Sequence, residues 1–506
     1  MGTTNAPTQT SLEDFLKPLE VDLPRIVELT NDFTETFTHL SAHSLDQFLA
    51  TPISESILRP APGRDYGRFL AIDIGGTNLR VGFIELSGAQ DDEPSVSGDG
   101  PPPRHLKRLL EQSWSIQNHL KNENSESLFS WIGAHIAEVV AKGCEAFDLP
   151  ATTALPMGVT FSFPIRQTSL SSATLLPMGK GFAITSPLDL GAHLTRGYDQ
   201  HRTPRLPPLR IAAIANDAVA TLVSFLYRFP AAPRQRAAMG LIVGTGCNAT
   251  IALPLRSLHP SKRPTAVRVL PGDADADVRI AVNTEWGING TAPPLRRLGL
   301  VTRWDDALDA AGEAPGFQPL EYMTAGRYLG ELARLVFVEY LVAVAGVDAE
   351  GLPAGLGRRF GLTTTFASFF FPGGPKGPVL EQLGAEFPPP SSSGFRWAEA
   401  HADALHRIAK AVERRAAGIV AAATVGLLRC AGEIPGGEGV EELVVGYTGG
   451  CIQYFQDYLE DAQGFVDGIM EAYEPMRVRL SPCHDGGITG AGILVPAAMA
   501  GEEVRN

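Results

Sequence analysis

The spacing of apolar residues changes along the chain between a helical and a strand-like pattern. Apolar side chains recur three and four positions apart near the start, as at Leu12, Phe15 and Leu16, which predicts helices over residues 11–48. The apolar run 69–73 and a second run over 79–84 are separated by two glycines, which predicts a strand, a tight turn and a strand. Longer helical patterns cover residues 127–147, 325–346 and 401–428.

Further strands are predicted where short apolar runs end in polar or glycine-rich turns. The runs lie at 211–215, 240–253 and 443–445. Because strands and helices interleave, the fold class is α/β, and three glycine-rich turns that directly follow strands suggest a duplicated architecture. The Gly/Pro/Asp-rich segment 89–104 and the Pro/Ser-rich segment 388–394 are expected to be loops, the first of them exposed and mobile.

Length, charge and cysteine content narrow the class of protein. A chain of 506 residues is long enough for two lobes. The formal net charge of -14 argues against bulk binding to nucleic acid or to anionic membrane. Five scattered cysteines without a C-x-x-C pair fit free thiols in a reducing compartment, so we expect a cytoplasmic protein, with a nuclear or mitochondrial-surface location left open.

Neither a secretory signal nor a membrane span is expected from the pattern. The first twenty residues are polar and acidic. The most apolar stretch, residues 416–428, is shorter than the roughly 20 residues that a membrane helix needs, and we interpret it as a buried helix.

The first candidate site is the turn that follows the strand 69–73. Asp73 ends this strand, and the sequence Gly75-Gly76-Thr77-Asn78 leads to Arg80. Glycines let a ligand approach the backbone, and the hydroxyl and the guanidinium group suit a polyphosphate. The alternative is an ordinary hairpin turn, in which glycine serves the backbone only.

Two further segments carry candidate groups for a substrate hydroxyl. Ser162 and Phe163 precede a turn in which Lys180 is flanked by glycines, although an exposed turn lysine is the commoner case. Asn216 and Asp217 end the uncharged strand 211–215, and a carboxylate there can accept a proton from a hydroxyl. The alternative for Asp217 is the N-cap of the following helix.

A second strand–turn–strand contains the sequence Gly244-Thr245-Gly246-Cys247-Asn248, which again suits a phosphate. We reject Cys247 as a nucleophile because no histidine lies near it in the sequence, and a small cysteine in a turn is more often structural.

Two isolated carboxylates complete the set of candidates. Glu285, which is followed by Trp286, and Glu321 can accept hydrogen bonds from hydroxyl groups, and the aromatic ring can shape a pocket. Solvated surface acids are the default alternative. A glycosidase pair is a further alternative, against which the phosphate-type turns argue.

In this order the motifs resemble those of eukaryotic hexokinases and glucokinases of the actin-like ATPase superfamily, over roughly residues 25–500. The segments that show this resemblance are 69–81, 161–164 with 180–182, 216–217, 244–248, 283–287 and 329–331. The resemblance implies a two-lobed actin-like (ribonuclease H-like) sugar kinase fold with a cleft between the lobes. The expected division is residues 1–67 as a helical part of the large lobe, 68–216 as the small lobe, 217–484 as the large lobe, and 485–506 as a C-terminal helix that returns to the small lobe.

The resemblance also implies roles for individual residues in an ATP-dependent transfer to glucose or a similar hexose. Asp217 would be the general base, with Lys180 as the second catalytic residue, and Mg²⁺ would bind with ATP, through water to Asp73 and Asp217. The sugar would contact Ser162, Phe163, Asn216, Asp217, Asn248, Glu285 and Glu321. The nucleotide would contact Asp73, Gly75, Gly76, Thr77, Asn78, Arg80, Gly244, Thr245, Gly246, Thr364, Ser368, Gly449 and Gly450.

Four positions depart from the family pattern. The family has Thr where this chain has Gly179, Thr where it has Ala218, and Ser where it has Gly450 and Gly487. These losses support a second hypothesis, a catalytically weak or inactive glucose sensor with regulatory protein partners. A third, an actin-like ATPase that acts without sugar, would leave Ser162, Glu285 and Glu321 unexplained.

Overall fold

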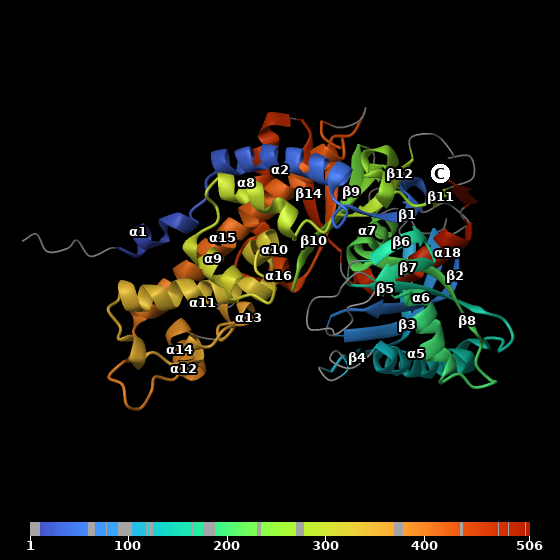
Figure 1. Ribbon diagram of the computed structural model, residues 1–506, viewed down its shortest axis with the longest axis horizontal. Helices are drawn as coiled ribbons and strands as arrows, with labels where there is room; N and C mark the ends of the chain where they lie inside the picture. The colour runs from blue at the N-terminus through green and yellow to red at the C-terminus, as the bar shows by residue number, and fades with distance from the viewer. Residues whose placement is uncertain are drawn as a thin grey trace, which may run out of the picture.

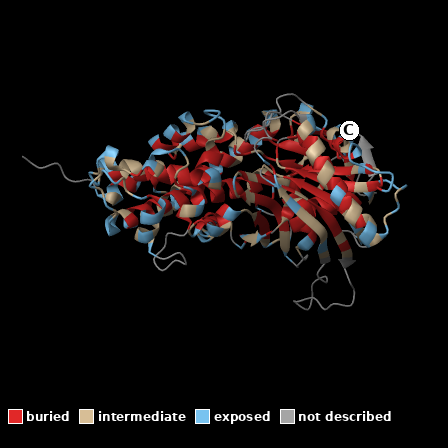
Figure 2. Ribbon diagram, turned by 90° about the horizontal axis from the view of Figure 1, so that it is seen from below, coloured by how far each residue is buried: buried red, intermediate tan, exposed pale blue. Residues whose placement is uncertain are grey.

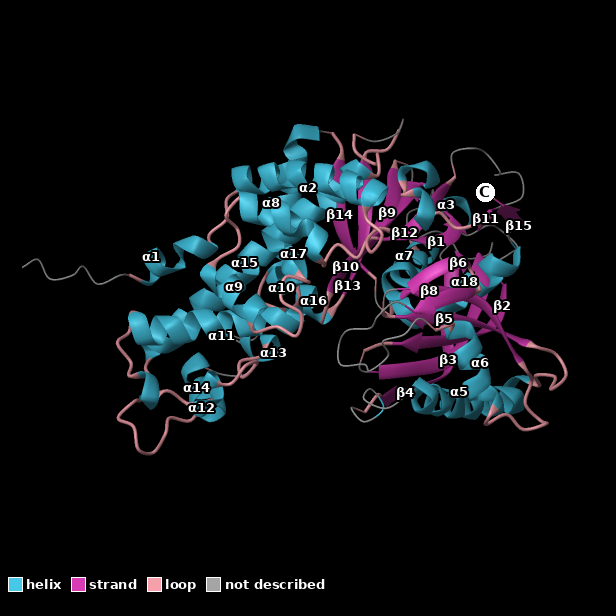
Figure 3. Cartoon of the chain, in the orientation of Figure 1, coloured by secondary structure: helices cyan, strands magenta, loops and turns pink. Residues whose placement is uncertain are grey.

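The structure is a computed structural model of the chain. It describes residues 11–58, 66–76, 78–89, 104–117, 120, 125–163, 165–175, 188–229, 234–269, 278–368, 378–435, 439–473, 475–483, 485–500 and 502–505. Helices gather at one end of an elongated molecule, and two large sheets occupy its middle and its other end (Figures 1 and 3). Buried residues run through the helical end as well as through the sheets (Figure 2).

The smaller sheet has the strand order β4-β3-β2-β5-β8. Its strands are β4 (Arg104–Ser115), β3 (Asn78–Ala89), β2 (Tyr66–Ile74), β5 (Leu155–Phe161) and β8 (Leu209–Asn216). The predicted strand–turn–strand is confirmed, since β2 and β3 form an antiparallel pair. β2, β5 and β8 are parallel, so their carboxyl ends lie at one edge of the sheet.

The larger sheet has eight strands in the order β14-β13-β9-β10-β12-β1-β11-β15. They are β14 (Arg477–Pro482), β13 (Glu442–Thr448), β9 (Gln235–Val243), β10 (Cys247–Pro254), β12 (Arg279–Asn283), β1 (Leu49–Ser54), β11 (Ala266–Val269) and β15 (Glu502–Arg505). A small hairpin, β6 (Ile165–Ser169) with β7 (Ser172–Leu175), stands apart from both. The strand–turn–strand predicted over residues 240–253 is β9 with β10.

Long helices cover the larger sheet and continue beyond it. α15 runs for 32 residues and packs on α2 and α17. Residues 416–428 lie within α15 and are all buried, which confirms the predicted buried helix. The helices are α1 (Leu12–Leu16), α2 (Leu23–His43), α3 (Glu55–Leu58), α5 (Ser125–Phe147), α6 (Leu190–Asp199), α7 (Asp217–Arg228), α8 (Ala292–Arg297), α9 (Arg303–Ala310), α10 (Pro319–Thr324), α11 (Gly326–Ala343), α12 (Ala354–Gly357), α13 (Thr364–Ala367), α14 (Val379–Glu386), α15 (Glu399–Cys430), α16 (Gly450–Tyr454), α17 (Tyr458–Met470) and α18 (Gly486–Ala500).

Two helices connect the sheets. α7 contacts strands of both sheets, and α18 packs on α7 and on β2, β5 and β8 of the smaller sheet (Figure 1). The α7–α18 contact is close because glycines face α7: a Cβ atom at Gly490 would lie 2.1 Å from the carbonyl oxygen of Ala220. The first turns of α7 and α18 are therefore held at a fixed separation near the smaller sheet.

Some predictions concern residues that the structure does not describe, and others are not tested by it. Most of the loop 89–104 and the turn around Lys180 are not described. Residues 502–505 form β15, which pairs with β11 of the larger sheet after α18 has packed on the smaller one. The proposed division into lobes stays a prediction. Within the described ranges, no helix is both long and apolar enough to cross a membrane.

Candidate active site

Polar side chains collect at the carboxyl edge of the smaller sheet. Sheet register sets Ile74 opposite Phe161 and Phe161 opposite Asn216, so the residues that end these strands are neighbours. The Ser162 N–H donates to the carbonyl oxygen of Ile74 at 3.0 Å. The Asn216 amide lies 3.5 Å from the carbonyl oxygens of Phe161 and Phe163. The edge thus brings Asp73, Ser162, Asn216 and Asp217 together.

The helix cap at this edge is Asn216 rather than Asp217. The Asn216 side-chain oxygen accepts from the N–H of Ala218 at 2.8 Å, which is the capping bond of α7, and Oδ1 of Asp217 accepts from the same N–H at 2.9 Å. Asp217 is the first helical residue and is half-buried. The alternative in which Asp217 serves as the cap is therefore wrong, and the carboxylate is carried on the first turn of α7, where the helix dipole favours negative charge.

Asp73 and Asp217 are electrostatic neighbours. Asp73 is only 7% exposed, and burial is the main cause that raises its pKa to about 6. The charge of Arg80 opposes this shift, whereas the charges of Asp217, Glu111 and Asp485 add to it. Two carboxylates that interact electrostatically, in a site that also contains an arginine, are typical of a site that binds a cation and phosphates.

The turn between β2 and β3 supplies the backbone of this site. The Gly75 N–H donates to the carbonyl oxygen of Asn78 at 2.9 Å, and a Cβ atom at Gly75 would lie 3.3 Å from that oxygen. Arg80 follows on β3, with its Nε 3.4 Å from Oδ2 of Asp73. Gly76 belongs to the same turn, while Thr77 lies outside the described residues.

A second group of candidates lies where β10 begins and β12 ends, on the larger sheet. Oε1 of Glu285 accepts from Nδ2 of Asn283 at 2.8 Å and lies 3.4 Å from Nδ2 of Asn248. Nδ2 of Asn248 also donates to Oδ1 of Asn283 at 2.8 Å. The backbone of Glu285 has a φ of 45°, and its carbonyl oxygen accepts from the side chain of Gln47 at 2.9 Å. Carboxylate and amide groups in this arrangement match hydroxyl groups of a sugar. Asn283 was not among the predicted site residues, although it begins the motif that contains Glu285.

Glu321 joins this group from α10. Its Oε2 accepts from the N–H of Cys247 at 3.1 Å, and its Oε1 accepts from the Gln318 amide at 3.1 Å. Cys247 is 2% exposed, and burial raises the pKa of its thiol to about 12, which agrees with our rejection of it as a nucleophile. Trp286, expected to shape a pocket, is instead fully buried and stacks on Phe37 with ring centroids 5.9 Å apart.

The two remaining glycine turns lie against each other. Gly244 closes the β9–β10 turn by donating to the carbonyl oxygen of Gly246 at 2.9 Å, with Thr245 between them. Gly449 has a φ of 122°, and a Cβ atom there would lie 2.2 Å from the carbonyl oxygen of Val243. A side chain is therefore excluded at 449. At Gly450 the nearest atom to a Cβ would be 3.8 Å away, so a serine would fit there.

Thr364 begins α13 and Ser368 is its C-cap, and their hydroxyls take part in packing. Oγ1 of Thr364 accepts from the N–H of Gly330 at 2.7 Å, and Oγ of Ser368 donates to the carbonyl oxygen of Thr364 at 2.6 Å. Both side chains are buried. Their link to the glycine turn at 449–450 is indirect: the Gln456 amide, beyond α16, donates to the carbonyl oxygen of Ala367 at 2.6 Å.

Lys180, predicted to be catalytic, lies outside the described residues. Asp485 was not among the predicted site residues, and Gly487 was predicted only as a departure from the family pattern, yet both lie near Asp73. A Cβ atom at Gly487 would lie 2.7 Å from Oδ2 of Asp73. The two glycines after Asp485 were the sequence signal for such a close approach.

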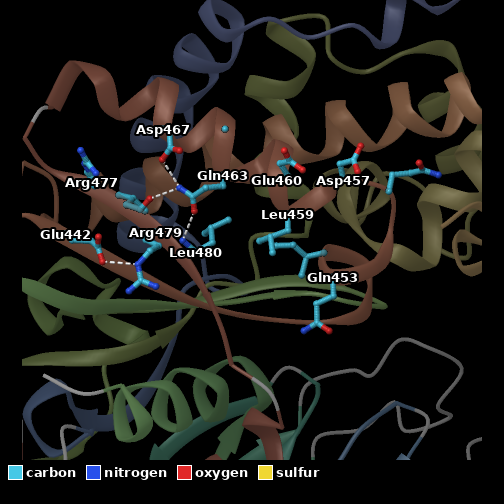
Figure 4. A pocket seen from close by; sticks show the side chains of 14 residues that line it. Glu442, Gln453, Asp457, Leu459, Glu460, Gln463, Asp467, Arg477, Arg479 and Leu480 are labelled. Carbon is cyan, nitrogen blue, oxygen red and sulfur yellow. Dashed lines mark hydrogen bonds and ion pairs between the residues drawn. The ribbon is translucent and has the colours of Figure 1, made fainter. Parts of the chain in front are cut away.

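A separate hollow of about 820 Å³ lies between α17 and the edge strand β14 (Figure 4). None of the predicted site residues lines it. The Gln463 amide bonds there to the carbonyl oxygen of Val478 at 2.9 Å and to the N–H of Leu480 at 2.8 Å. These are backbone groups of the edge strand, so Gln463 protects the edge from pairing with another chain.

Comparison with known proteins gives relatives that cover most of the chain. Arabidopsis thaliana hexokinase-1 is 29% identical over 441 residues, which cover 85% of this chain and 80% of the relative. Solanum tuberosum hexokinase-2 is 28% identical over 448 residues, with the same coverage. A Schistosoma mansoni hexokinase structure in complex with glucose has the same fold, with a TM-score of 0.74, 23% identity, and 96% of this chain and 98% of that one covered. Two hexokinase family models match residues 11–227 and 238–497, and the chain therefore belongs to the hexokinase family.

Proposed function

We propose that this hexokinase transfers the terminal phosphoryl group of ATP to the 6-hydroxyl of D-glucose or a similar hexose, with Asp217 as the general base. The observation that carries the proposal is the position of Asp217. It begins α7 at the carboxyl edge of the smaller sheet, next to Ser162 and Asn216 and in the field of Asp73.

The residues around the start of β10 support the proposal of hexose binding. Asn248, Glu285 and Glu321 present amide and carboxylate oxygens around the start of β10, and such groups hydrogen-bond hydroxyls in pairs. The Schistosoma mansoni relative was solved with glucose, which supports the same class of ligand here. Orienting the hexose in this way is the main contribution that a kinase makes, together with the neutralisation of phosphate charge.

The residues around Asp73 fit Mg²⁺ bound with ATP. Carboxylate oxygens are the donors that Mg²⁺ prefers, and Asp73 and Asp217 would hold it through water. When bound, the ion neutralises charge on the phosphates. Arg80 and the backbone of the Gly75-Gly76 turn lie beside the same carboxylate and would contact phosphate oxygens.

A coupled assay tests the proposal. Purified protein is given Mg-ATP with glucose, fructose, mannose or galactose, and formation of hexose 6-phosphate is followed beside a control kinase. Turnover with at least one hexose is expected. Hexose binding by calorimetry without turnover would replace the proposal with the glucose sensor, whose regulatory partners would then need to be sought. ATP hydrolysis without any sugar phosphate would favour an ATPase. We also propose a cytoplasmic location, which the free cysteines support and cell fractionation tests.

A further inference from the structure

A chain of four alternating charges runs from β4 to Asp73. Nη1 of Arg108, on β4, lies 3.0 Å from Oδ2 of Asp485. The other Asp485 oxygen, Oδ1, accepts from Nη1 of Arg80 at 3.3 Å. Arg80 in turn has its Nε 3.4 Å from Oδ2 of Asp73. Arg80 therefore lies between two carboxylates, one at the predicted phosphate turn and one just before α18.

The backbone fixes Asp485 in this position. Its φ of 57° is uncommon for a residue with a side chain and is tolerated by Asp better than by most. Its carbonyl oxygen accepts from Oγ1 of Thr489 at 2.6 Å, and that hydroxyl bonds to Oγ of Ser224 at 2.7 Å. Ser224 belongs to α7, the helix that begins with Asp217. Asp485 is thus tied to the same helix that carries the proposed general base.

The two glycines after Asp485 let it come this close. A Cβ atom at Gly486 would lie 2.8 Å from the Cα atom of Thr221 on α7, and one at Gly487 would lie 2.7 Å from Oδ2 of Asp73. The start of α18 therefore lies closely packed between α7 and Asp73, and Asp485 is the residue just before this helix. Close backbone contacts with α7 and with Asp73 therefore contribute to this placement.

From this geometry we propose that Asp485 is a positioning residue for phosphoryl transfer, which holds the Arg80 guanidinium group between itself and Asp73. The inference rests on the proposed function and deepens it. Arg80 has a long side chain that is 34% exposed and would otherwise sample many rotamers. Two carboxylates, one at its Nε and one at its Nη1, hold it before ATP binds, and a guanidinium group held in this way is presented to phosphate oxygens.

The competing interpretation is a pair of surface ion pairs that adds only to stability. Exposed ion pairs contribute little, and breaking one should leave kinetics unchanged. The two interpretations differ in two respects. A positioning role predicts that kcat/KM for ATP changes and that this change requires Arg80, whereas a stabilising role predicts neither.

The experiment compares Asp485→Asn with Glu441→Gln in the full chain. Glu441 forms an exposed ion pair with Arg234 at 2.6 Å, at the opposite end of β13 from the Gly449–Gly450 turn, and is the matched control. For Asp485→Asn we expect kcat/KM for ATP to fall about 10-fold, while KM for the hexose and Tm stay within the range of the control. Asp485→Glu, which keeps the charge, should recover part of the loss, and Arg108→Gln should show a smaller loss of the same kind.

A double-mutant cycle with Arg80→Gln decides between the interpretations. If Asp485 acts through Arg80, adding Asp485→Asn to Arg80→Gln should change kcat/KM for ATP less than 2-fold. An undiminished 10-fold loss in that background would overturn the proposal, as would an unchanged single variant. The same cycle is read by calorimetry of Mg-ATP binding, which needs no turnover. A wild type that binds ATP but makes no sugar phosphate would contradict the proposed function alone, and the binding cycle would still test Asp485.

Discussion

The carboxylate of Asp73 lies directly against the backbone of Gly487, so close that a Cβ atom at position 487 would be 2.7 Å from Oδ2 and 2.9 Å from Oδ1. The Asp73 side chain is short and buried, and β2 fixes its backbone, so it has little room to move away. The family pattern has serine at this position. In this chain the absence of a side chain at position 487 leaves room for the Asp73 carboxylate in its observed position. Glycine at 487 is therefore no evidence of lost activity.

Gly487→Ala is expected to displace the Asp73 carboxylate and to lower kcat by about 10²-fold, because misplacement of a group at the site by about 1 Å has effects of that size. The KM for the hexose should change little, since Asn248 lies on the larger sheet, Glu285 follows its strand β12, and Glu321 lies on α10. Steady-state kinetics with varied hexose and varied ATP check this.

Gly464→Ala is the control for that substitution. Gly464 lies in α17, and a Cβ atom there would have no neighbour within 4 Å. Alanine should leave kcat unchanged and raise the free energy of unfolding by up to about 1 kcal/mol, since glycine is unfavourable inside a helix. A Gly487→Ala enzyme as active as this control would show that Asp73 can shift without consequence.

The catalytic assignment is tested at Asp217. If it takes the proton of the 6-hydroxyl, Asp217→Ala should lower kcat by about 10²–10⁴-fold. The hexose Kd measured by calorimetry should change much less, because the contacts expected at Asn248 and Glu285 remain. Asp217→Asn keeps the shape of the side chain and should lose as much activity as alanine. A rate close to wild type in either variant would remove Asp217 as the base.

Local sequence patterns were enough to predict several elements of the site and of the core. The β2–β3 hairpin, the buried segment 416–428 and the position of Asp217 after β8 each follow from a short apolar run and the residues that end it. Apolar burial and strand ends are local properties, so a single segment contains the information.

Other features depend on contacts between distant segments and could not be predicted from one segment. Asn216 and Asp217 are both good cap residues, and only the backbone of α7 shows that Asn216 is the cap and Asp217 the first helical residue. Trp286 follows a predicted ligand, yet packing on Phe37 of α2 places it in the core. The closeness of Gly487 to Asp73 joins positions more than 400 apart in sequence. No motif within one segment contains such a relationship.

Glu285→Gln tests the group at β10 and β12. The carboxylate accepts from Asn283 and lies within reach of Asn248, so it orders both amides as well as offering an acceptor to a hydroxyl. Loss of the charge should raise the KM for the hexose about 10-fold, which corresponds to one hydrogen bond to a charged group, and leave the KM for ATP unchanged. Glu386→Gln, at the exposed end of α14, is the control and should match wild type. An equal rise in both KM values would indicate a general disturbance of the fold.

The pH dependence of stability should reflect a carboxyl that is buried between α15 and α17. Glu413 is fully buried, and burial is the main cause that raises its pKa to about 8. Its partner Lys410 lies 2.8 Å from it, but the same ammonium group also pairs with Asp457 and Asp461, each at 2.7 Å. Three carboxyl groups therefore share one lysine. Glu413 is the most buried of the three, so burial favours its neutral form.

The sign of the effect follows from proton uptake. Between the ordinary Glu pKa of 4.5 and about 8, the folded state holds a proton on Glu413 that the unfolded state has lost. The free energy of unfolding should therefore fall as pH rises through this range, by up to about 1.4 kcal/mol per pH unit from this group. Glu413→Gln, which stays neutral, should flatten the profile and be more stable than wild type at pH 8. Urea denaturation at pH 5.5, 6.5, 7.5 and 8.5 measures this, with Glu460→Gln on the exposed face of α17 as the control. A Glu413→Gln profile parallel to that of the control would mean that Glu413 is ionised in the folded protein, with Lys410 as its effective partner.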